Sequence, residues 1–144
     1  MTTSSPPRRI LVVCLGNYCR SPFAARVLAD LGDDAVEVRS AGLIGTWQEA
    51  HPEMVAVAAV LGYDLTGHHP APVTPELIEW ADLVLAMDHA VLDRLHALVG
   101  PDSATEMRLY LDHDRDVPDP MGRSAVEFVY CALLIEAGAA NHLP

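Results

Sequence analysis

The sequence predicts an α/β fold: a single three-layer domain in which helices cover both faces of a four-stranded parallel sheet. Short apolar runs alternate with longer segments of helical periodicity along the chain, an order typical of parallel strands joined by right-handed crossovers. The 144 residues, 51% of them hydrophobic, suffice for one core and not for two. A strand, a tight turn and a helix start also follow one another near the N-terminus, which is the most informative stretch of the chain.

This stretch begins with Ile-Leu-Val-Val at 10–13, an unbroken apolar run of the kind found in a fully buried parallel strand. Residues 14–20 then form a tight turn that contains one Gly, one Asn and two Cys. Ser21 and Pro22 open a helix, with Ser21 as its cap and Pro22 at its first position. Residues 1–8, mostly Thr, Ser, Pro and Arg, are expected to be a flexible tail before the domain at 9–144.

The later elements follow from periodicity, caps and breakers. Gly32 and Gly62 end the first two helices, Thr74 and Asp88 cap the next two, and Gly100 stops the fourth. We expect helices over 21–31, 51–61, a short stretch from 74, 88–99 and 124–139, and strands over 10–13, 36–40, 82–87 and 106–111. In the closing helix we expect Val126, Val129, Leu133 and Leu134 to face the core.

A strand, a turn and a helix N-terminus together make a cradle for anions. Backbone N–H groups of the turn converge there, and the helix dipole adds partial positive charge. Gly16 and Asn17 are residue types that tolerate the positive φ such a turn needs. Arg20 lies six positions after Cys14, so both side chains can reach the same bowl, where a guanidinium can bind two phosphate oxygens at once. We therefore expect a phosphate loop after the first strand.

A cysteine in that field is expected to be a thiolate at neutral pH, and a thiolate beneath a phosphate is a phosphoryl-transfer nucleophile. The alternative is a free cysteine that merely ends a buried strand. Parallel strands end at one edge of the sheet, so we expect Cys14, Ser40, Asp88 and the acidic loop at 111–122 to share that edge. The acid for the leaving group must come from another segment, and the loop offers Asp112, Asp114, Asp116 and Asp119.

The stretch Cys-Leu-Gly-Asn-Tyr-Cys-Arg-Ser-Pro at 14–22 resembles the phosphate loop of the low-molecular-weight protein tyrosine phosphatases, and the resemblance extends over nearly the whole chain. It implies that Cys14, Arg20 and Asp119 are catalytic, because Asp119 with Pro120 matches the Asp-Pro element of the family. It implies that Asn17 is a scaffold residue and that Ser21 donates its hydroxyl to the Cys14 sulfur. The residues expected to bind phosphate are Leu15, Gly16, Asn17, Tyr18, Cys19 and Arg20.

The same resemblance implies a substrate wall of Tyr18, Trp47 and Met121, and each of these can instead be a packing residue. Met121 and Gly122 stand where the family usually carries aromatic residues, and Ala25 stands where many members have Glu. These departures leave the substrate open: a phosphotyrosine protein, phosphoarginine, or a small phosphoester. Cys19 is a candidate redox partner of Cys14.

Composition excludes several classes of function. The formal net charge of −11, with only Arg among the basic residues, argues against nucleic acid and anionic membranes as partners. Residues 1–9 lack the apolar region of a signal peptide, and three cysteines do not suggest a disulfide framework, so we expect a cytoplasmic protein. His68, His69 and the group at 112–114 lack a coherent ligand spacing, so we expect neither metal nor cofactor.

Rival functions remain on the same scaffold. Arsenate reduction would need resolving cysteines near the middle of the chain, where the sequence has none. Protein-arginine phosphatases have a similar phosphate loop but typically carry Thr at the position of Tyr18. A non-catalytic phosphate-binding module would not need Cys14, Arg20 and Asp119 together.

Overall fold

The first strand of the chain lies inside a parallel sheet whose strand order is β2-β1-β3-β4, which confirms the predicted fold class. The computed structural model describes residues 5–45 and 47–144. Residues 1–4 of the predicted tail lie outside the described residues, and Arg8 already belongs to β1. The strands are β1 (Arg8–Cys14), β2 (Val36–Gly42), β3 (Leu83–Ala86) and β4 (Glu106–Leu109).

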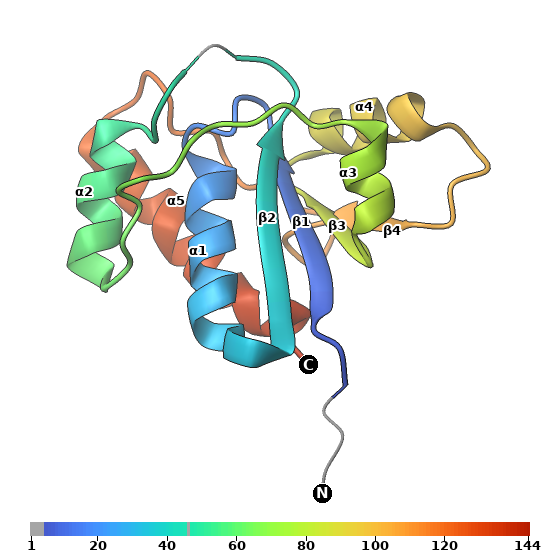
Figure 1. Ribbon diagram of the computed structural model, residues 1–144. Helices are drawn as coiled ribbons and strands as arrows, with labels where there is room; N and C mark the ends of the chain where they lie inside the picture. The colour runs from blue at the N-terminus through green and yellow to red at the C-terminus, as the bar shows by residue number, and fades with distance from the viewer. Residues whose placement is uncertain (1–4, 46) are drawn as a thin grey trace, which may run out of the picture.

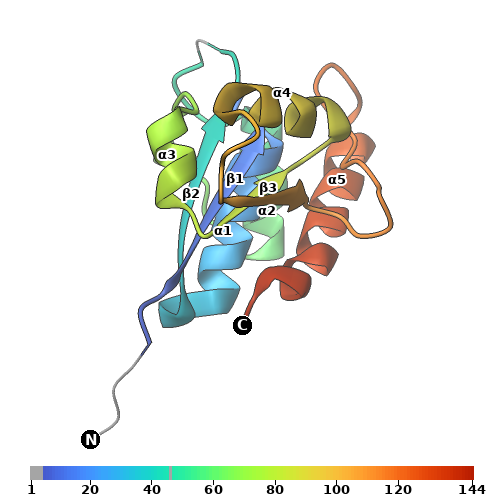
Figure 2. The same ribbon diagram turned by 90° about the vertical axis from the view of Figure 1, so that its right-hand side faces the viewer.

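Helices cover both faces of this sheet, as Figures 1 and 2 show: α1, α2 and α5 lie on one side and α3 and α4 on the other. Both described ends of the chain lie at the end of the sheet opposite the loop that follows β1 (Figure 1). The helices are α1 (Arg20–Gly32), α2 (Pro52–Leu61), α3 (Pro75–Trp80), α4 (His89–Val99) and α5 (Ala125–Gly138), with short 3-10 turns at Asp33–Ala35 and Ala139–His142.

The apolar run of β1 is buried on both faces. Ile10 and Val12 pack in the core layer of α1, α2 and α5, whereas Leu11 and Val13 pack in the layer of α3 and α4, and all four side chains are fully buried. Successive side chains of a strand point to opposite faces, so a strand covered on both sides must be apolar throughout. The two layers thus fix β1 rigidly, and Cys14 is its last residue.

The predicted core face of the closing helix is wrong. Val126, Val129 and Leu133 are exposed by 73%, 41% and 47%, and Leu134 is only partly buried against the core. Helix α5 instead buries Phe128, Cys131, Ala132 and Ile135, which repeat at the same i, i+3, i+4, i+7 spacing. The helix thus carries two apolar stripes, and periodicity alone does not choose between them.

A tertiary contact favours the observed stripe. The buried hydroxyl of Tyr110 donates a hydrogen bond to the carbonyl oxygen of Ile135 at 2.6 Å, which ties the C-terminal half of α5 to the segment after β4. Gly138 allows the same close approach, because a Cβ there would lie 3.1 Å from the Tyr110 ring. Leu31 of α1 and Val60 of α2, which continue the apolar periodicity of their helices, are likewise exposed, by 53% and 87%.

Gly42, the last residue of β2, lies against the turn that follows β1. It pairs with Cys14 in register, and a Cβ at this position would lie 2.7 Å from the backbone nitrogen of Asn17 and 2.7 Å from the carbonyl carbon of Gly16. Gly42 also exchanges hydrogen bonds with the segment at 71–73, donating to Ala71 at 2.8 Å and accepting from Val73 at 2.9 Å. Gly42, and not the predicted Ser40, is therefore the β2 residue that borders the turn.

We predict that Gly42→Ala lowers the free energy of unfolding by about 1–3 kcal/mol, because backbone atoms must move to admit the methyl group. Urea unfolding measures the loss, and vanadate binding measures the damage to the turn. Ser40→Ala, two residues earlier on β2, is the matched control and is expected to be close to wild type. A Gly42→Ala variant with wild-type stability and wild-type vanadate affinity would contradict the prediction.

Candidate active site

The C-terminal end of β1 delivers Cys14 to the bottom of a bowl, and α1 begins at Arg20 on its other side. The Cys14 side chain is buried, with 2% exposure. The predicted cap of the helix is wrong: its N-cap is Cys19, which makes no side-chain capping bond, and Ser21 and Pro22 already lie inside the first turn. Ser21 is unavailable as a cap because its hydroxyl is bound to the turn.

Two hydrogen-bond donors point at the Cys14 sulfur. The backbone N–H of Asn17 donates to Sγ at 3.1 Å, and Ser21 Oγ lies 3.0 Å from Sγ. Asn17 Nδ2 donates to Ser21 Oγ at 2.8 Å, so the hydroxyl oxygen is already an acceptor and its own hydrogen is free for the sulfur. The Asn17 amide is oriented in this sense because its Oδ1 accepts from the backbone N–H of Ala71 at 2.9 Å. The Cys14 sulfur therefore has two hydrogen-bond partners within the turn and its helix.

The carbonyl groups of the turn point away from the bowl and are bound outside it. The Leu15 oxygen accepts from Leu43 and Ile44 at 2.8 Å each, and the Tyr18 oxygen accepts from the N–H of His51 at 2.9 Å. In a planar trans peptide the N–H of the next residue points opposite to the carbonyl. Peptide N–H groups after these carbonyls therefore point into the bowl, where an oxyanion can accept from them.

Asn17 has the backbone conformation that the sequence predicts, whereas Gly16 does not. The φ of Asn17 is 52°, in the left-handed region. Gly16 is outside that region, and it is needed for another reason: a Cβ there would lie 2.5 Å from the ring of Trp47. Glycine at this position thus admits the indole to the rim of the bowl.

Arg20 is held by one of its terminal nitrogens, and the rest of its donors are left for a ligand. Its Nη1 donates to Asp88 Oδ2 at 2.9 Å and to the carbonyl oxygen of Val117 at 2.8 Å. Because both Nη1 protons are used, Nε and Nη2 are the donors that an oxyanion can take. Burial alone would lower the pKa of Arg20, but its hydrogen bond to Asp88 and the nearby charges of Cys14 and Asp119 outweigh it and raise the pKa. Arg20 is thus a fixed cation with only 3% exposure.

Of the four aspartates that the sequence offers as the acid, Asp119 lies at the rim of the bowl. Its Oδ2 is 3.9 Å from Nη2 of Arg20, its Oδ1 accepts from the N–H of Met121 at 3.1 Å, and its side chain is 44% exposed. The other three carboxylates have partners outside the bowl. Asp112 accepts from Arg115 at 3.0 Å, and Asp114 and Asp116 contact His89.

Aromatic side chains line one side of the bowl. The rings of Tyr18 and Trp47 stack with centroids 4.6 Å apart and an interplanar angle of 10°. The cavity above Cys14 is lined by residues of the turn together with Trp47, Asp119 and Met121. Met121, another residue that lines this cavity, is 41% exposed and adds an unbranched apolar side chain. The three predicted wall residues thus border the same cavity.

Cys19 and Cys131 are buried thiols. Burial and, to a smaller degree, the negative charge at Cys14 raise the pKa of Cys19 far above its ordinary value, so its thiol stays protonated at neutral pH. Burial likewise raises the pKa of Cys131 to about 12, as expected for the inert core residue that the sequence predicts. Both of them, like Cys14, are free cysteines.

Sequence reasoning missed two residues that support the turn. Asp88 was predicted to cap a helix at the same edge of the sheet as Cys14, but without a partner there; it does cap α4, accepting from Val91 at 2.8 Å, and its other oxygen binds Arg20. His68 Nε2 binds the carbonyl oxygen of Asn17 at 2.9 Å, and burial lowers the pKa of His68, so the neutral ring donates this bond. The place of Asp88 directly after β3 was the available signal for the first; no local signal pointed to His68.

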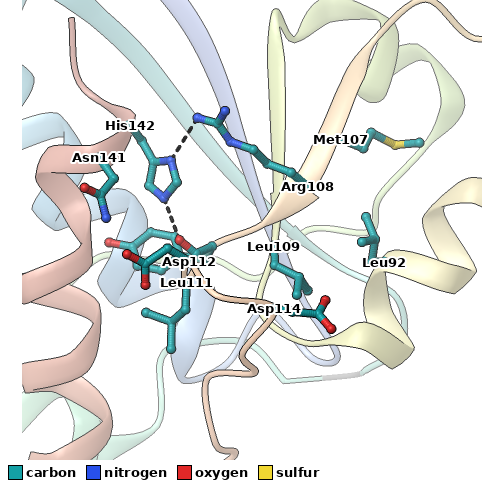
Figure 3. Close-up of a pocket in the computed structure, with 10 residues that line it drawn as sticks. Leu92, Met107, Arg108, Leu109, Leu111, Asp112, Asp114, Asn141 and His142 are labelled. Atoms are coloured by element: carbon teal, nitrogen blue, oxygen red, sulfur yellow. Dashed lines mark hydrogen bonds between the residues drawn. The ribbon is translucent and has the colours of Figure 1, made fainter.

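A larger cavity of about 490 Å³ lies apart from the bowl, beside β4. Figure 3 shows Arg108 and His142 joined across one side of it, with Asp112 and Asp114 of the acidic loop at its lower edge. The buried His142 accepts from Arg108 at 3.2 Å and donates to the Tyr110 carbonyl at 2.7 Å; burial lowers its pKa. These contacts anchor the C-terminal end of the chain and the root of the loop.

Within residues 5–45 and 47–144, no cluster of three or more His, Cys, Asp or Glu side chains is arranged to hold a metal ion. In the same part of the chain, every helix is too short or too polar to cross a bilayer.

The fold and the site together define a cysteine-dependent phosphatase. Residues 9–143 match the family model described as low molecular weight phosphotyrosine protein phosphatase. The low molecular weight protein-tyrosine-phosphatase Wzb of Escherichia coli K12 is 34% identical over 135 residues, covering 90% of this chain and 89% of that protein. This chain therefore belongs to the low molecular weight phosphotyrosine protein phosphatase family.

Solved structures agree with this assignment. The structure of Vibrio vulnificus Wzb in complex with benzylphosphonate superposes with a TM-score of 0.84 at 32% identity, covering 93% of this chain and 95% of that one. The YwlE arginine phosphatase of Geobacillus stearothermophilus gives the same TM-score at 29% identity, covering 93% and 89%. The scaffold is thus similar to proteins named for two different phosphorylated residues.

We predict that Asn17→Ala lowers the free energy of unfolding by about 2–4 kcal/mol, because it strains a positive φ and leaves the N–H of Ala71 without its acceptor. Asn17→Gly is the matched variant: it removes the same amide but allows the backbone conformation, so its loss should be smaller by about 1 kcal/mol. Urea unfolding measures both. Equal stability of the two variants would contradict a role for the backbone conformation.

Proposed function

We propose that this protein hydrolyses phosphomonoesters through a phosphocysteine intermediate on Cys14, and that its substrate is phosphotyrosine in a protein. The observation that supports this most directly is the buried Cys14 sulfur, which has two donors of its own beneath inward-facing amides and beside Arg20. A sulfur held in this way is prepared to attack a phosphorus atom bound above it.

In the first step the Cys14 thiolate attacks phosphorus, an S–P bond forms and the P–O bond to the leaving group breaks. Nε and Nη2 of Arg20 and the amides of residues 15–20 bind the equatorial oxygens, whose charge is best matched in the transition state. Asp119, at the rim of the bowl, gives its proton to the departing oxygen. Its exposure on the solvent side of Arg20 suits this role, because the leaving group departs away from the sulfur.

In the second step Asp119, now a carboxylate, takes a proton from a water molecule whose oxygen attacks phosphorus. The S–P bond breaks, orthophosphate is released and the electron pair returns to the sulfur. The Ser21 hydroxyl, already aimed at Sγ, stabilises the departing thiolate. Asn17 fixes that hydroxyl and its own backbone N–H at once.

The stacked pair of Tyr18 and Trp47 supports an aryl substrate, because the flat face of a phosphotyrosine ring can pack against it. A second candidate is phosphoarginine or a small phosphoester. Met121 lines the same cavity and can pack against a substrate without selecting an aromatic ring, and one similar structure is titled an arginine phosphatase. A non-catalytic module is less well supported, because binding alone does not require Asp119 at the rim.

The test of the substrate is to measure kcat/KM of the wild-type protein for a phosphotyrosine peptide, a phosphoarginine peptide and a small alkyl phosphate. We expect the phosphotyrosine peptide to give the highest kcat/KM. A higher kcat/KM for the phosphoarginine peptide would replace the proposed substrate and keep the mechanism. If none of the three is hydrolysed, the non-catalytic phosphate-binding module becomes the better-supported function.

We further propose that the protein works in the cytoplasm, where free thiols persist, and that residues 9–143 act as one catalytic domain. A redox role of Cys19 stays a prediction. Peroxide would oxidise the Cys14 thiolate to a sulfenic acid, and the Cys19 sulfur would displace water from it to form a disulfide. Because the Cys19 thiol is buried and protonated, the turn must first open for this step.

We predict that Asp119→Ala lowers kcat/KM, which reports the first chemical step, by about 100-fold for a substrate with a poor leaving group and by about tenfold or less for one with a good leaving group. The physical reason is that a good leaving group departs without a proton. Steady-state and burst kinetics with alkyl and nitrophenyl phosphates measure the difference. Asp112→Ala, in the same loop but bound to Arg115, is the control and should leave both rates unchanged. An equal loss on both substrates would rule out Asp119 as the acid.

A further inference from the structure

The first residue of α4, His89, is bound on three sides by the acidic loop. Its Nε2 lies 2.7 Å from Asp114 Oδ1, its Nδ1 contacts Asp116 Oδ1, and its backbone N–H donates to the same Asp116 oxygen at 2.9 Å. Nothing in the proposed chemistry uses this group, which is on the outside of the bowl. Figure 3 shows Asp114 on the side of the neighbouring cavity that carries Leu92 of α4, away from His142.

The geometry implies a charged ring. Ionised carboxylates only accept hydrogen bonds, so a histidine that binds one at each ring nitrogen must carry a proton on both. His89 is then an imidazolium between two carboxylates, and these hydrogen bonds raise its pKa above the ordinary value. The contacts are exposed, by 45% at His89 and 87% at Asp114, so each is screened by solvent and salt.

This contact lies next to the segment that carries the acid. Asp116 precedes Val117, whose carbonyl accepts from Arg20 and whose N–H donates to Met87 at 2.7 Å, and Asp119 follows two residues later. His89 itself follows Asp88, the partner of Arg20. The N-terminal end of α4 therefore binds Arg20 through its cap, Asp88, and the acidic loop through its first residue, His89.

We propose that His89 is a positioning residue for catalysis: its imidazolium fastens Asp114 and Asp116 to α4 and so keeps Asp119 at the rim of the bowl. This inference rests on the proposed function, because it assumes that Asp119 serves the leaving group. His89 does not touch the substrate. It acts by restricting the acidic loop. The nearest other contacts that hold this loop are the two backbone hydrogen bonds of Val117.

The charged groups near His89 lie on the acidic loop and on α4. On the loop they are Asp114 and Asp116, while Arg115 between them is bound to Asp112 at 3.0 Å. On α4, Asp88 is bound to Arg20 and to the N–H of Val91. The remaining charged neighbours by sequence are Asp93 and Arg94 of α4 and His113 of the loop, which contacts Asp112.

The sign of the pH dependence follows from the raised pKa of His89. The imidazolium is present below that pKa, so the loop is fastened there, and the fastening is lost as the pH rises through it. His89→Ala should therefore cost activity at low pH and little at high pH. His89→Arg keeps a cation with several donors at every pH, so it should keep the loop fastened where wild type releases it.

The test compares kcat and KM of wild type, His89→Ala and His89→Arg between pH 5 and pH 9, with alkyl and nitrophenyl phosphates. For the alkyl phosphate we expect His89→Ala to lower kcat about fivefold at pH 5.5 with KM unchanged, and to approach wild type at high pH. His89→Arg should match wild type at pH 5.5 and exceed it at high pH. His96→Ala, at the exposed far end of α4, should be unchanged throughout.

A loss that is equal at all pH values, or equal on the two substrates, would overturn the proposal, because it would indicate a general structural effect. The protonation of His89 can be measured without turnover. In NMR, the ring proton resonances of His89 should titrate at higher pH in wild type than in Asp116→Asn. Unchanged titration in that variant would also overturn it. Failure of wild type to hydrolyse any phosphate would instead refute the proposed function, and the NMR titration would remain interpretable.

Discussion

The site depends on the left-handed backbone of one residue, Asn17. Its N–H donates to the Cys14 sulfur, its carbonyl accepts from His68, and its side-chain amide joins Ser21 on one side and Ala71 on the other. All four contacts are available only because the chain turns at a φ of 52°. Cys14, the Ser21 hydroxyl and the 64–73 segment are therefore held in register by a single buried residue, and a change in its conformation would move all of them together.

The electrostatics of the site are local. The chain carries a formal net charge of −11, yet the bowl is built to attract anions, since amide dipoles and one guanidinium act at hydrogen-bond distance whereas the surface carboxylates are screened by solvent. Asp88 holds Arg20 in place and still leaves Nε and Nη2 for a ligand. The segments that follow β3 and β4 thus have complementary tasks: Asp88 after β3 orients Arg20, and the acidic loop after β4 brings Asp119 to within 3.9 Å of it.

Much of this architecture could be predicted from the sequence, because it depends on local chemistry. The buried run of β1, the alternation of strands and helices and the caps Thr74 and Asp88 each have a signal within a few residues. What could not be predicted depends on contacts between distant segments. Helix α5 has two apolar stripes and the contact with Tyr110 favours one, and Gly16 is needed for the indole of Trp47, not for its φ. The second task of Asp88 and the contacts of His68 and His89 are of the same kind.

The central claim is that the Cys14 sulfur becomes covalently phosphorylated during turnover. The most direct measurement is rapid acid quenching of the Asp119→Ala protein during turnover of an aryl phosphate, followed by mass spectrometry of the peptide that contains Cys14. Slow hydrolysis of the intermediate in this variant favours its accumulation. We expect a phosphoryl group on Cys14 that forms within the burst, decays with further incubation and is absent from Cys14→Ser. Continued turnover with an unmodified Cys14 peptide, or turnover by Cys14→Ser at the wild-type rate, would contradict it.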